Sequence, residues 1–344
     1  MPRVNRSKIY SGSDRQAFLI THRCVRRTRL CGRMPGGGRD YTYRKRWIRD
    51  RCRVLREAFS IQICTYAILS NHFHLVILSC PDQAAHWTET EIAARWLSLF
   101  PTAAMKRDSR DSPNTAEINA IATDAERVNV LRDRLVSVSW FMKCLAEPVA
   151  RRANREDDVS GHFWEGRYDV RPLKDQFALI AAMVYVDLNE VRAGIADTPE
   201  TGEFTGLSER IRIAGKRLKD RGQGAPCCDW LVPFPDRSPQ PQKCQLWTEQ
   251  NPKPKMPFLE VEFVAYLEVV DWSGRHLHRG RKSRISSAVP PIIEKLAIPG
   301  EHWIAIVSNF RKSFRFAAEL PSRIVKKPMK TVHRRIAAVN KGGA

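Results

Sequence analysis

Two histidines separated by one residue are the first side chains in this sequence that could carry chemistry. His72 and His74 lie in SIQICTYAILSNHFHLVILS, where two apolar runs are separated by Ser70-Asn71. Turn-forming residues between apolar runs predict an antiparallel hairpin. Side chains at i and i+2 of a strand share one face, so both imidazoles should point the same way. Such a pair could hold one divalent ion and leave coordination positions open for substrate oxygens.

The spacing of the two histidines alone does not establish a metal site. His276-Leu277-His278 has the same spacing, but it lies among arginines and glycines without a flanking apolar run, so we do not expect it to bind metal. Taken without context, His72 and His74 are better explained as strand histidines whose polar atoms are satisfied locally.

A tyrosine and an asparagine four residues apart form the second candidate. The segment 176–191 is apolar at helical spacing and should be a helix, which would place Tyr185 and Asn189 on one face. Tyrosine can be a covalent nucleophile, and an asparagine oxygen can be a neutral third ligand for a hard metal. By themselves, a half-buried tyrosine and an asparagine at a helix end are the simpler interpretation.

Combined, the two candidates describe one reaction. A metal that polarises a phosphate oxygen and a tyrosine that attacks phosphorus would displace a deoxyribose 3′-hydroxyl and leave the protein linked to the 5′ phosphate. A phenol titrates near ~10, so it needs a nearby cation or base at neutral pH. Of the other tyrosines, Tyr168 has no partner four residues on and is a weaker nucleophile candidate, and Tyr66 should be core.

Positive charge dominates the chain. Its 344 residues include 58 Lys and Arg against 37 Asp and Glu, for a net charge of +21. Such an excess favours a polyanionic partner, most often nucleic acid. Basic residues gather in two clusters on the core, and the run is mostly one-signed and interleaved with Tyr41, Tyr43 and Trp47, which suits a nucleic-acid backbone better than plain solvation. We assign DNA contacts to Arg26, Arg27 and Arg29 in the first cluster (Arg23 to Arg33), to Arg46 and Arg49 in the second (Arg44 to Arg56), and to Trp164 and Arg167 in GHFWEGRYDV.

For Trp164 and Arg167 two interpretations are equally weighted. They could provide a stacking surface and a phosphate clamp for unpaired DNA, or simple packing and a surface charge. The basic tail, with Lys326, Lys327 and Arg335, should add sequence-independent affinity.

The elements that must position these residues follow from the same patterns. Residues 16–25 should form a first strand and 161–172 an extended segment, while helices are expected over 41–59, 88–98, 128–153 and 176–191. The polar stretch 102–126 should be an insertion loop. Beyond residue 222, proline and glycine indicate a linker over 222–257, followed by a small helical unit with a basic tail over 258–344.

Composition excludes several other classes. The chain is 43% hydrophobic and can bury a core. No segment approaches a membrane span, and MPRVNRSK lacks the apolar run of a signal peptide. Nine scattered cysteines without CxxC indicate a reducing compartment, without a disulfide framework or cysteine zinc site. We therefore expect a cytoplasmic, nucleoid-associated protein without a membrane partner; a homodimer is compatible with the sequence.

Three segments in order, YAILSNHFHLVILS, GHFWEGRYDV and YVDLNEVRAG, resemble the single-tyrosine HUH transposases, particularly REP-associated tyrosine transposases and insertion-sequence relatives. The resemblance runs from about Phe18 to about Ala196. It implies a ferredoxin-like α+β core with an antiparallel sheet over 1–221, a mainly helical C-terminal extension, a metal (Mg²⁺ or Mn²⁺) on His72 and His74, and Tyr185 as nucleophile. Asn189 stands where relatives carry a polar third ligand.

Two departures from the family pattern concern Glu190 and chain length. Relatives usually have proline at the position of Glu190, which changes the helix end more than the chemistry. The stretch between His74 and Tyr185 is longer than a compact member needs, and we expect 102–126 to account for the excess.

The resulting prediction is a metal-dependent endonuclease and strand transferase, a transposase that acts on single-stranded or hairpin DNA. The alternative is a domesticated, non-catalytic protein that binds DNA hairpins or repeats. A replication or conjugation nickase is less consistent, since such proteins usually order the tyrosine and histidines differently or carry a helicase-like domain, and no GxxxxGK[ST] occurs.

Overall fold

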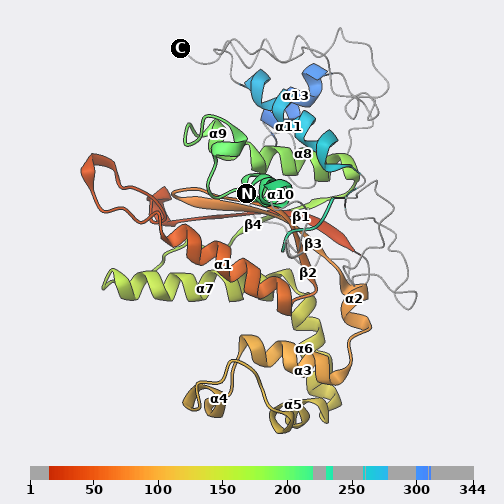
Figure 1. Cartoon of the computed structure of the whole chain (residues 1–344). Coiled ribbons are helices and arrows are strands. Elements are labelled where there is room, and N and C mark those ends of the chain that lie inside the picture. Colours follow the sequence, from red (N-terminus) through yellow and green to blue (C-terminus); the bar gives the residue numbers. More distant parts are fainter. Residues whose placement is uncertain are drawn as a thin grey trace.

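The core of the molecule is a four-stranded antiparallel sheet. The computed structural model describes residues 15–219, 230–234, 259, 261–277, 300–308 and 310. The strands are β1 (Gln16–Arg23), β2 (Ile61–Ile68), β3 (His72–Ser79) and β4 (Asp169–Leu173), and their order in the sheet is β2-β3-β1-β4. Each neighbouring pair is antiparallel. With its many helices the protein is a mixed α+β fold (Figure 1).

The predicted hairpin is confirmed. β2 and β3 pair from Ile61↔Ser79 to Ile68↔Phe73, with an irregularity between Ile63 and Thr65. The turn is closed where the Leu69 amide donates to the carbonyl of His72 at 2.8 Å. His72 therefore begins its strand directly after the turn.

Side chains alternate between two hydrophobic cores along each strand, as the strand period requires. Phe18, Ile20, Phe73 and Leu75 belong to one core, which α1 (Arg44–Ala58) and α7 (Val138–Glu156) cover. Leu19 and Val76 belong with other alternate residues to a second core, which includes α8 (Gln176–Asp187). Figure 1 shows α1 and α7 on one side of the sheet and α8 on the other.

The stretch 102–126, expected to be a loop, is instead largely helical. It forms α4 (Ala103–Arg107), α5 (Thr115–Ala122) and the first residues of α6 (Ala125–Val136). Its polar residues are the caps of these helices: Thr102 accepts from the Met105 amide, and Asn114 forms a capping box with Glu117. Together with α2 (Pro81–Ala85) and α3 (Glu89–Leu99), these helices form the lobe at the bottom of Figure 1.

Two helices predicted as continuous are interrupted. The segment 128–153 is divided at Ser137, whose extended backbone ends α6 and whose hydroxyl caps α7. The segment 176–191 is divided at Leu188 into α8 and α9 (Asn189–Arg192). Tyr185 therefore lies near the end of α8 and Asn189 begins α9, so the prediction of one continuous helix is wrong.

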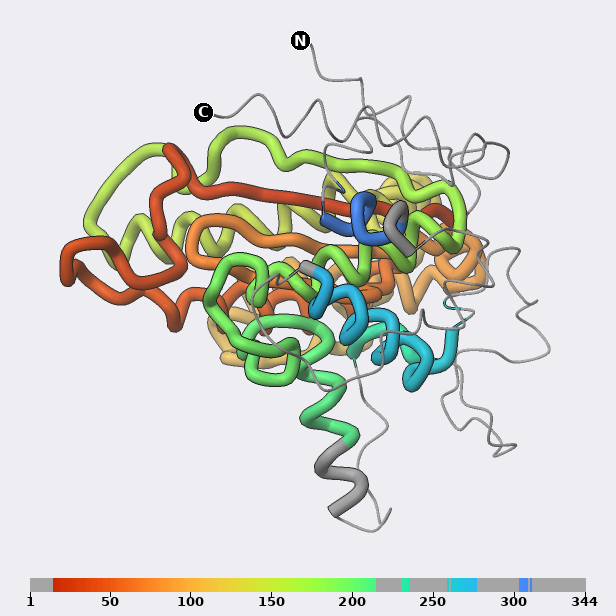
Figure 2. Tube along the Cα trace, turned by 90° about the horizontal axis from the view of Figure 1, so that it is seen from above, coloured from red at the N-terminus to blue at the C-terminus, as the bar shows by residue number. Residues whose placement is uncertain are grey.

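The remaining elements connect these layers. They are η2 (Val25–Arg27), η3 (Pro35–Gly37), η4 (Pro199–Thr201) and α10 (Gly206–Lys219). Figures 1 and 2 show that the connection between β1 and α1 projects beyond the end of the sheet. No described helix is long and apolar enough to cross a bilayer.

Two C-terminal helices lie over α8. They are α11 (Phe263–Leu277) and α13 (Gly300–Ser308), and both share the second core with α8 (Figure 2). Residues 230–234 run along β2, where the Val232 amide donates to the carbonyl of Ile63 at 2.8 Å. The rest of the predicted linker, the segment 278–299 and the basic tail lie outside the described residues.

A buried carboxylate joins the sheet, α8 and α11. Asp187 accepts from the hydroxyls of Thr65 and Tyr266, each at 2.5 Å, and from the Leu207 amide at 3.3 Å. Burial raises the pKa of Asp187 to about 6, against the opposing effects of these donors and of Arg210. The folded protein therefore binds this proton more tightly than the unfolded chain does.

We expect Asp187→Asn to flatten part of the pH dependence of stability. Since the folded pKa of Asp187 is raised, its contribution is complete below pH 4 and is lost as the pH rises through about 6. Relative to wild type, the free energy of unfolding of the variant should rise by up to about 3 kcal/mol across this window. Urea unfolding of both proteins between pH 4 and 7.5 measures this, with exposed Asp111→Asn as control. A difference that stays constant with pH would contradict the assignment.

Candidate functional site

The sheet register places both histidines of β3 on the face that carries α8. His72 is paired with Arg23 and His74 with Thr21. The next residues of this face, Val76 and Leu19, belong to the core that contains α8. The imidazoles thus lie at the end of β3 nearest the turn, between the sheet and α8.

Each imidazole makes a hydrogen bond through its Nδ1 atom, so Nε2 is the nitrogen of each ring that remains for a ligand. The His72 Nδ1 lies 2.7 Å from the Oδ1 of Asn71, and the His74 Nδ1 lies 2.9 Å from the Oγ1 of Thr21. An amide oxygen only accepts, so the His72 Nδ1 carries the proton and its Nε2 carries a lone pair. Oxygen partners of this kind orient metal-ligating histidines in proteins. The two ring centroids are 4.9 Å apart in an edge-to-face arrangement.

Both histidines are neutral at neutral pH. Burial, followed by the positive charge of Arg23, lowers the pKa of His72 to about 4. The pKa of His74 is held well below its ordinary value, first by burial and then by His72, Arg23, Arg171 and Arg192. Metal binding requires the unprotonated imidazole, and this environment supplies it.

Tyr185 of α8 lies beside His74. Their ring centroids are 5.4 Å apart with an interplanar angle of 75°. The structure thus brings together the strand histidine and the helix tyrosine, 111 residues apart along the chain. The guanidinium carbon of Arg192 lies 5.0 Å from the centre of the Tyr185 ring and places a cation next to the phenol.

Phe310, shortly after the C-terminal helix α13, covers Tyr185. The ring of Phe310 stacks on Tyr185 with centroids 5.7 Å apart, and Tyr185 is only 8% exposed. Arg192 donates to the carbonyls of Val307 and Ser308 at the end of α13. Any ligand that contacts the Tyr185 hydroxyl must therefore approach a site that is partly closed in this conformation.

Asn189, the predicted third ligand, begins α9 and is 9% exposed. Among the described residues, no hydrogen bond links it to His72 or His74. The described part of the chain also holds no group of three or more His, Cys, Asp or Glu side chains suited to a metal. The two neutral imidazoles fit a divalent ion as donors, but no carboxylate completes the set.

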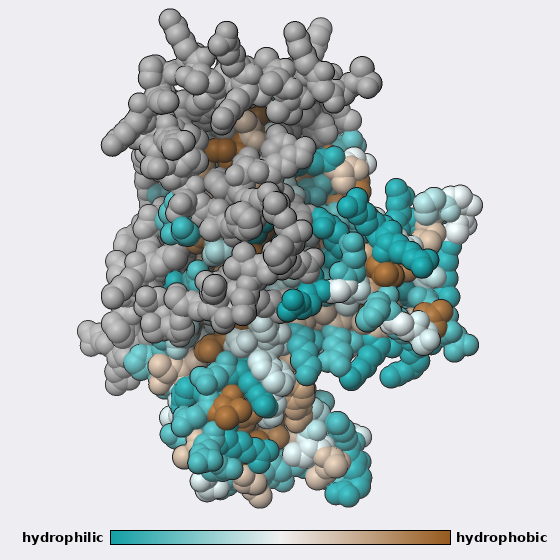
Figure 3. Space-filling view, turned by 180° about the vertical axis from the view of Figure 1, so that it is seen from behind, coloured by the Kyte–Doolittle hydropathy of each residue, from teal (hydrophilic) through white to brown (hydrophobic). Residues whose placement is uncertain are grey.

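The predicted DNA contacts of the β1–α1 connection are exposed. Arg26, Arg27 and Arg29 all face solvent, and the first two have positive φ angles of 52° and 56°. Left-handed backbone is rare for arginine, so the chain makes a tight turn that displays successive guanidinium groups. Figure 3 shows a largely hydrophilic surface at this projecting end of the molecule.

Several basic residues of α1 are buried or paired with acids, so the helix presents less positive charge to solvent than its sequence predicts. Arg44 is fully buried and ion-pairs with Glu156 and Asp157, and buried Lys45 lies 3.8 Å from Glu190. Part of the positive charge of α1 is therefore neutralised by acids at the end of α7 and on α9. Glu209 of α10 adds a further ion pair, with Arg53.

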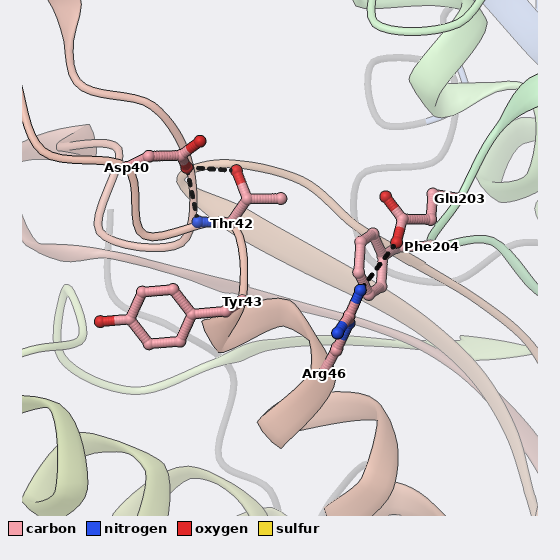
Figure 4. A pocket seen from close by; sticks show the side chains of 6 residues that line it. All are labelled: Asp40, Thr42, Tyr43, Arg46, Glu203 and Phe204. Atoms are coloured by element: carbon pink, nitrogen blue, oxygen red, sulfur yellow. Dashed lines mark hydrogen bonds and ion pairs between the residues drawn. The ribbon is translucent and has the colours of Figure 1, made fainter.

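Of the two α1 arginines assigned to DNA, Arg46 is exposed and Arg49 is half-buried beside Asp50. Arg46 lines a shallow pocket of about 330 Å³ and lies 3.7 Å from Glu203. Figure 4 shows Arg46 reaching towards Glu203 across the pocket, with Asp40 tied to Thr42 on the other side.

Trp164 is a core residue in this structure, which favours the packing alternative. It is 8% exposed, its indole donates to the Ala146 carbonyl at 2.9 Å, and it stacks on His22 at 4.6 Å. A base cannot stack on this ring without opening the core. Arg167 of the same segment is exposed.

Tyr168, Tyr66 and His276 make packing contacts and hydrogen bonds away from the candidate site. Tyr168 is buried, with its hydroxyl 3.2 Å from that of Ser139. Tyr66 is buried as predicted and donates to Glu209 at 2.6 Å. His276 packs on Trp272 with ring centroids 4.2 Å apart, and His278 lies outside the described residues.

Sequence reasoning missed Arg171, Arg192, Thr21 and Phe310 as members of this site. An arginine inside the short strand DVRPL was a usable signal, because strand alternation places it on the same face as Leu173. The position of Arg192 had no local signal, since it depends on the break at Leu188.

Comparison with known proteins gives little independent information. No protein-family model matches the chain, and no match was found among curated proteins. A solved structure of a REP-associated tyrosine transposase bound to a REP hairpin aligns with 62% of this chain and 86% of its own. The TM-score of 0.35 and the identity of 11% make this a distant structural likeness.

Proposed function

We propose that this protein is a transposase-like enzyme that cleaves and rejoins single-stranded or hairpin DNA, with Tyr185 as nucleophile. The observation that carries the proposal is the contact between His74 and Tyr185, whose rings lie 5.4 Å apart. A nucleophilic hydroxyl and a pair of neutral imidazoles must meet at one phosphate for this chemistry, and these residues are adjacent in space.

The proposed reaction is a transesterification. The Tyr185 oxygen attacks the phosphorus of a DNA phosphodiester, a new O–P bond forms, and the bond from phosphorus to the 3′ oxygen breaks. The phenol loses one proton and the leaving 3′ oxygen gains one. The product is a 5′-phosphotyrosine, and because its ester preserves the bond energy, attack by the 3′-hydroxyl of another strand can reverse the step without ATP.

A metal ion fits this proposal as a cofactor. His72 and His74 would hold Mg²⁺ or Mn²⁺, with Asn189 as the proposed third ligand. When bound, the ion would polarise a phosphate oxygen and so favour attack at phosphorus. Imidazole ligation favours Mn²⁺, whereas availability favours Mg²⁺.

The test is a search for the covalent product. The full-length protein is incubated with a hairpin-bearing single-stranded oligonucleotide and Mg²⁺ or Mn²⁺, then denatured and separated by electrophoresis. We expect a denaturant-resistant protein–DNA adduct and release of a fragment with a free 3′-hydroxyl. Tight hairpin binding without any adduct under either metal would contradict the proposed catalysis.

We expect the exposed arginines of the β1–α1 connection to supply backbone affinity. Replacing Arg26, Arg27 and Arg29 by Gln keeps side-chain bulk but removes three charges. Binding to single-stranded DNA should weaken, and the slope of log affinity against log salt should fall in magnitude by about 2, since each lost phosphate contact contributes about 0.7. Fluorescence anisotropy at several salt concentrations measures both.

The matched control removes three exposed charges from the helical lobe instead. Lys106, Arg107 and Arg127 lie on α4 and α6 and are exposed. Their replacement by Gln should leave the salt slope near that of wild type. Equal slopes for the two triple variants would exclude the β1–α1 connection as the DNA-binding surface.

A second candidate is a non-catalytic protein that binds DNA hairpins or repeats. The stacking of Phe310 on Tyr185 and the low exposure of that tyrosine favour it. A non-catalytic binding protein can be distinguished by measurement, because its binding to DNA would be independent of metal and would leave the DNA intact.

A further inference from the structure

A buried arginine on β4 is not explained by the histidine pair or by Tyr185. Arg171 is paired with Leu19 across the sheet, and Asp169, two residues earlier, is paired with Thr21. Strand alternation places Asp169, Arg171 and Leu173 on the face that carries α8. Arg171 therefore shares this face with His72 and His74.

The guanidinium of Arg171 is buried and only partly satisfied. Its side chain is 10% exposed, and its Nη2 donates to the carboxylate of Asp169 at 3.0 Å. The Nε and Nη1 atoms are buried and have no hydrogen-bond partner among the described residues. Leaving charged donors unpaired in the protein interior is unfavourable, so such a group calls for an explanation, and a bound ion or a catalytic role is one that fits this position.

Two other arginines concentrate positive charge at the same place. Arg23 is directly opposite His72 in the β1–β3 register, and Arg192 lies over the Tyr185 ring at 5.0 Å. The positive charges of Arg23, Arg171 and Arg192 each lower the pKa of His74. Asp169 supplies one carboxylate to this group and is already engaged by Arg171.

We propose that Arg171 binds the DNA phosphate that Tyr185 attacks, through the N–H groups on its free Nε and Nη1 atoms. The inference rests on the proposed function and extends it, because it assigns the phosphate to a residue of β4. Guanidinium groups suit phosphate oxygens, with which they form short charge-assisted hydrogen bonds. Placed beside the attacked phosphorus, Arg171 would also stabilise the negative charge that develops on the non-bridging oxygens. Asp169 acts as a positioning residue that fixes the guanidinium through Nη2.

Inorganic phosphate tests the site without requiring catalysis. Thermal unfolding is measured in sodium phosphate and in sodium chloride of equal ionic strength, for wild type, Arg171→Gln and Arg171→Lys. Wild type should be stabilised by phosphate, Arg171→Gln should bind it about tenfold or more weakly, and Arg171→Lys should keep part of the effect. Phosphate stabilisation that is absent from wild type, or is equal in Arg171→Gln, would overturn the proposal.

The matched control is another buried arginine that is bound to an aspartate. Arg15 pairs with Asp82, and its side chain is 4% exposed. Arg15→Gln should lose stability equally in both salts and keep the response to phosphate. Arg171→Gln should lose less stability in chloride than Arg15→Gln, because only Nη2 of Arg171 donates to Asp169, whereas both Nε and Nη2 of Arg15 donate to Asp82. A loss as large as that of Arg15→Gln in both salts would mark Arg171 as structural and overturn the proposal.

The covalent assay separates this inference from the proposed function. If wild type forms the adduct, Arg171→Gln should reduce its rate at least tenfold while leaving hairpin affinity within about threefold, since one phosphate among several is affected. An undiminished rate would overturn the role of Arg171 and leave the proposed function intact. If wild type forms no adduct but the phosphate response depends on Arg171, the anion site stands and the proposed catalysis fails.

Discussion

Tyr185→Phe should abolish the covalent protein–DNA adduct. The substitution removes only the hydroxyl that would attack phosphorus, so adduct formation should fall by about a thousandfold or more. The ring contacts with His74 and Phe310 remain possible for phenylalanine, so the fold should be kept. Denaturing electrophoresis with a labelled hairpin oligonucleotide measures the adduct, and anisotropy should show hairpin affinity close to that of wild type.

Tyr168→Phe is the matched control for this experiment. Tyr168 is also buried, and it lies in the sequence between His74 and Asn189. Its hydroxyl contacts that of Ser139. We expect Tyr168→Phe to retain the adduct. The opposite pattern, an adduct that survives loss of the Tyr185 hydroxyl and disappears with loss of the Tyr168 hydroxyl, would move the nucleophile to Tyr168, the residue before β4.

Replacing both histidines of β3 by alanine should remove the dependence on divalent metal. The His72→Ala, His74→Ala protein loses both neutral imidazole donors and, with them, the proposed metal site. Adduct yield at saturating Mn²⁺ should fall by about a hundredfold or more, on the scale typical of lost charge stabilisation at phosphorus. Titration with Mn²⁺ and Mg²⁺, followed by both adduct yield and thermal stabilisation, separates lost binding from lost catalysis.

The second histidine pair of the chain supplies the control. His276 has an identical local spacing to His278, but its ring packs on Trp272 and its Nδ1 lies 2.8 Å from the Trp272 carbonyl. His276→Ala should respond to Mn²⁺ as wild type does. A metal response that survives the double substitution on β3 would refute the assignment of the site.

Much of the fold near the site was predictable from local pattern. The turn residues Ser70 and Asn71 between apolar runs predicted the hairpin, and the strand period predicted that His72 and His74 share a face. Both results depend on interactions between residues close along the chain, which sequence periodicity records directly. The helix breaks at Ser137 and Leu188 were not predicted, because neither residue carries a glycine or proline signal.

Charge was the least reliable guide to function. The run from Arg44 to Arg56 looked like a DNA-binding surface, yet Arg44 and Lys45 are buried against Glu156, Asp157 and Glu190. Whether an arginine faces solvent or an acid depends on residues more than a hundred positions away. The prediction of a loop over 102–126 was wrong for a related reason. The Asp, Asn and Thr residues of this segment cap helices instead of lining a loop.

The sequence by itself determined the hairpin, the common face of the two histidines and the residue types suited to phosphoryl transfer, because a strand's alternation and a turn's preferences are local properties. Only the tertiary structure decided that Tyr185 meets His74, that Phe310 covers it, and that Arg171 is buried with two guanidinium nitrogens that have no partner among the described residues. These contacts join segments distant along the chain, and they depend on how α8 packs on the sheet that contains β4 and on how α13 packs on α8.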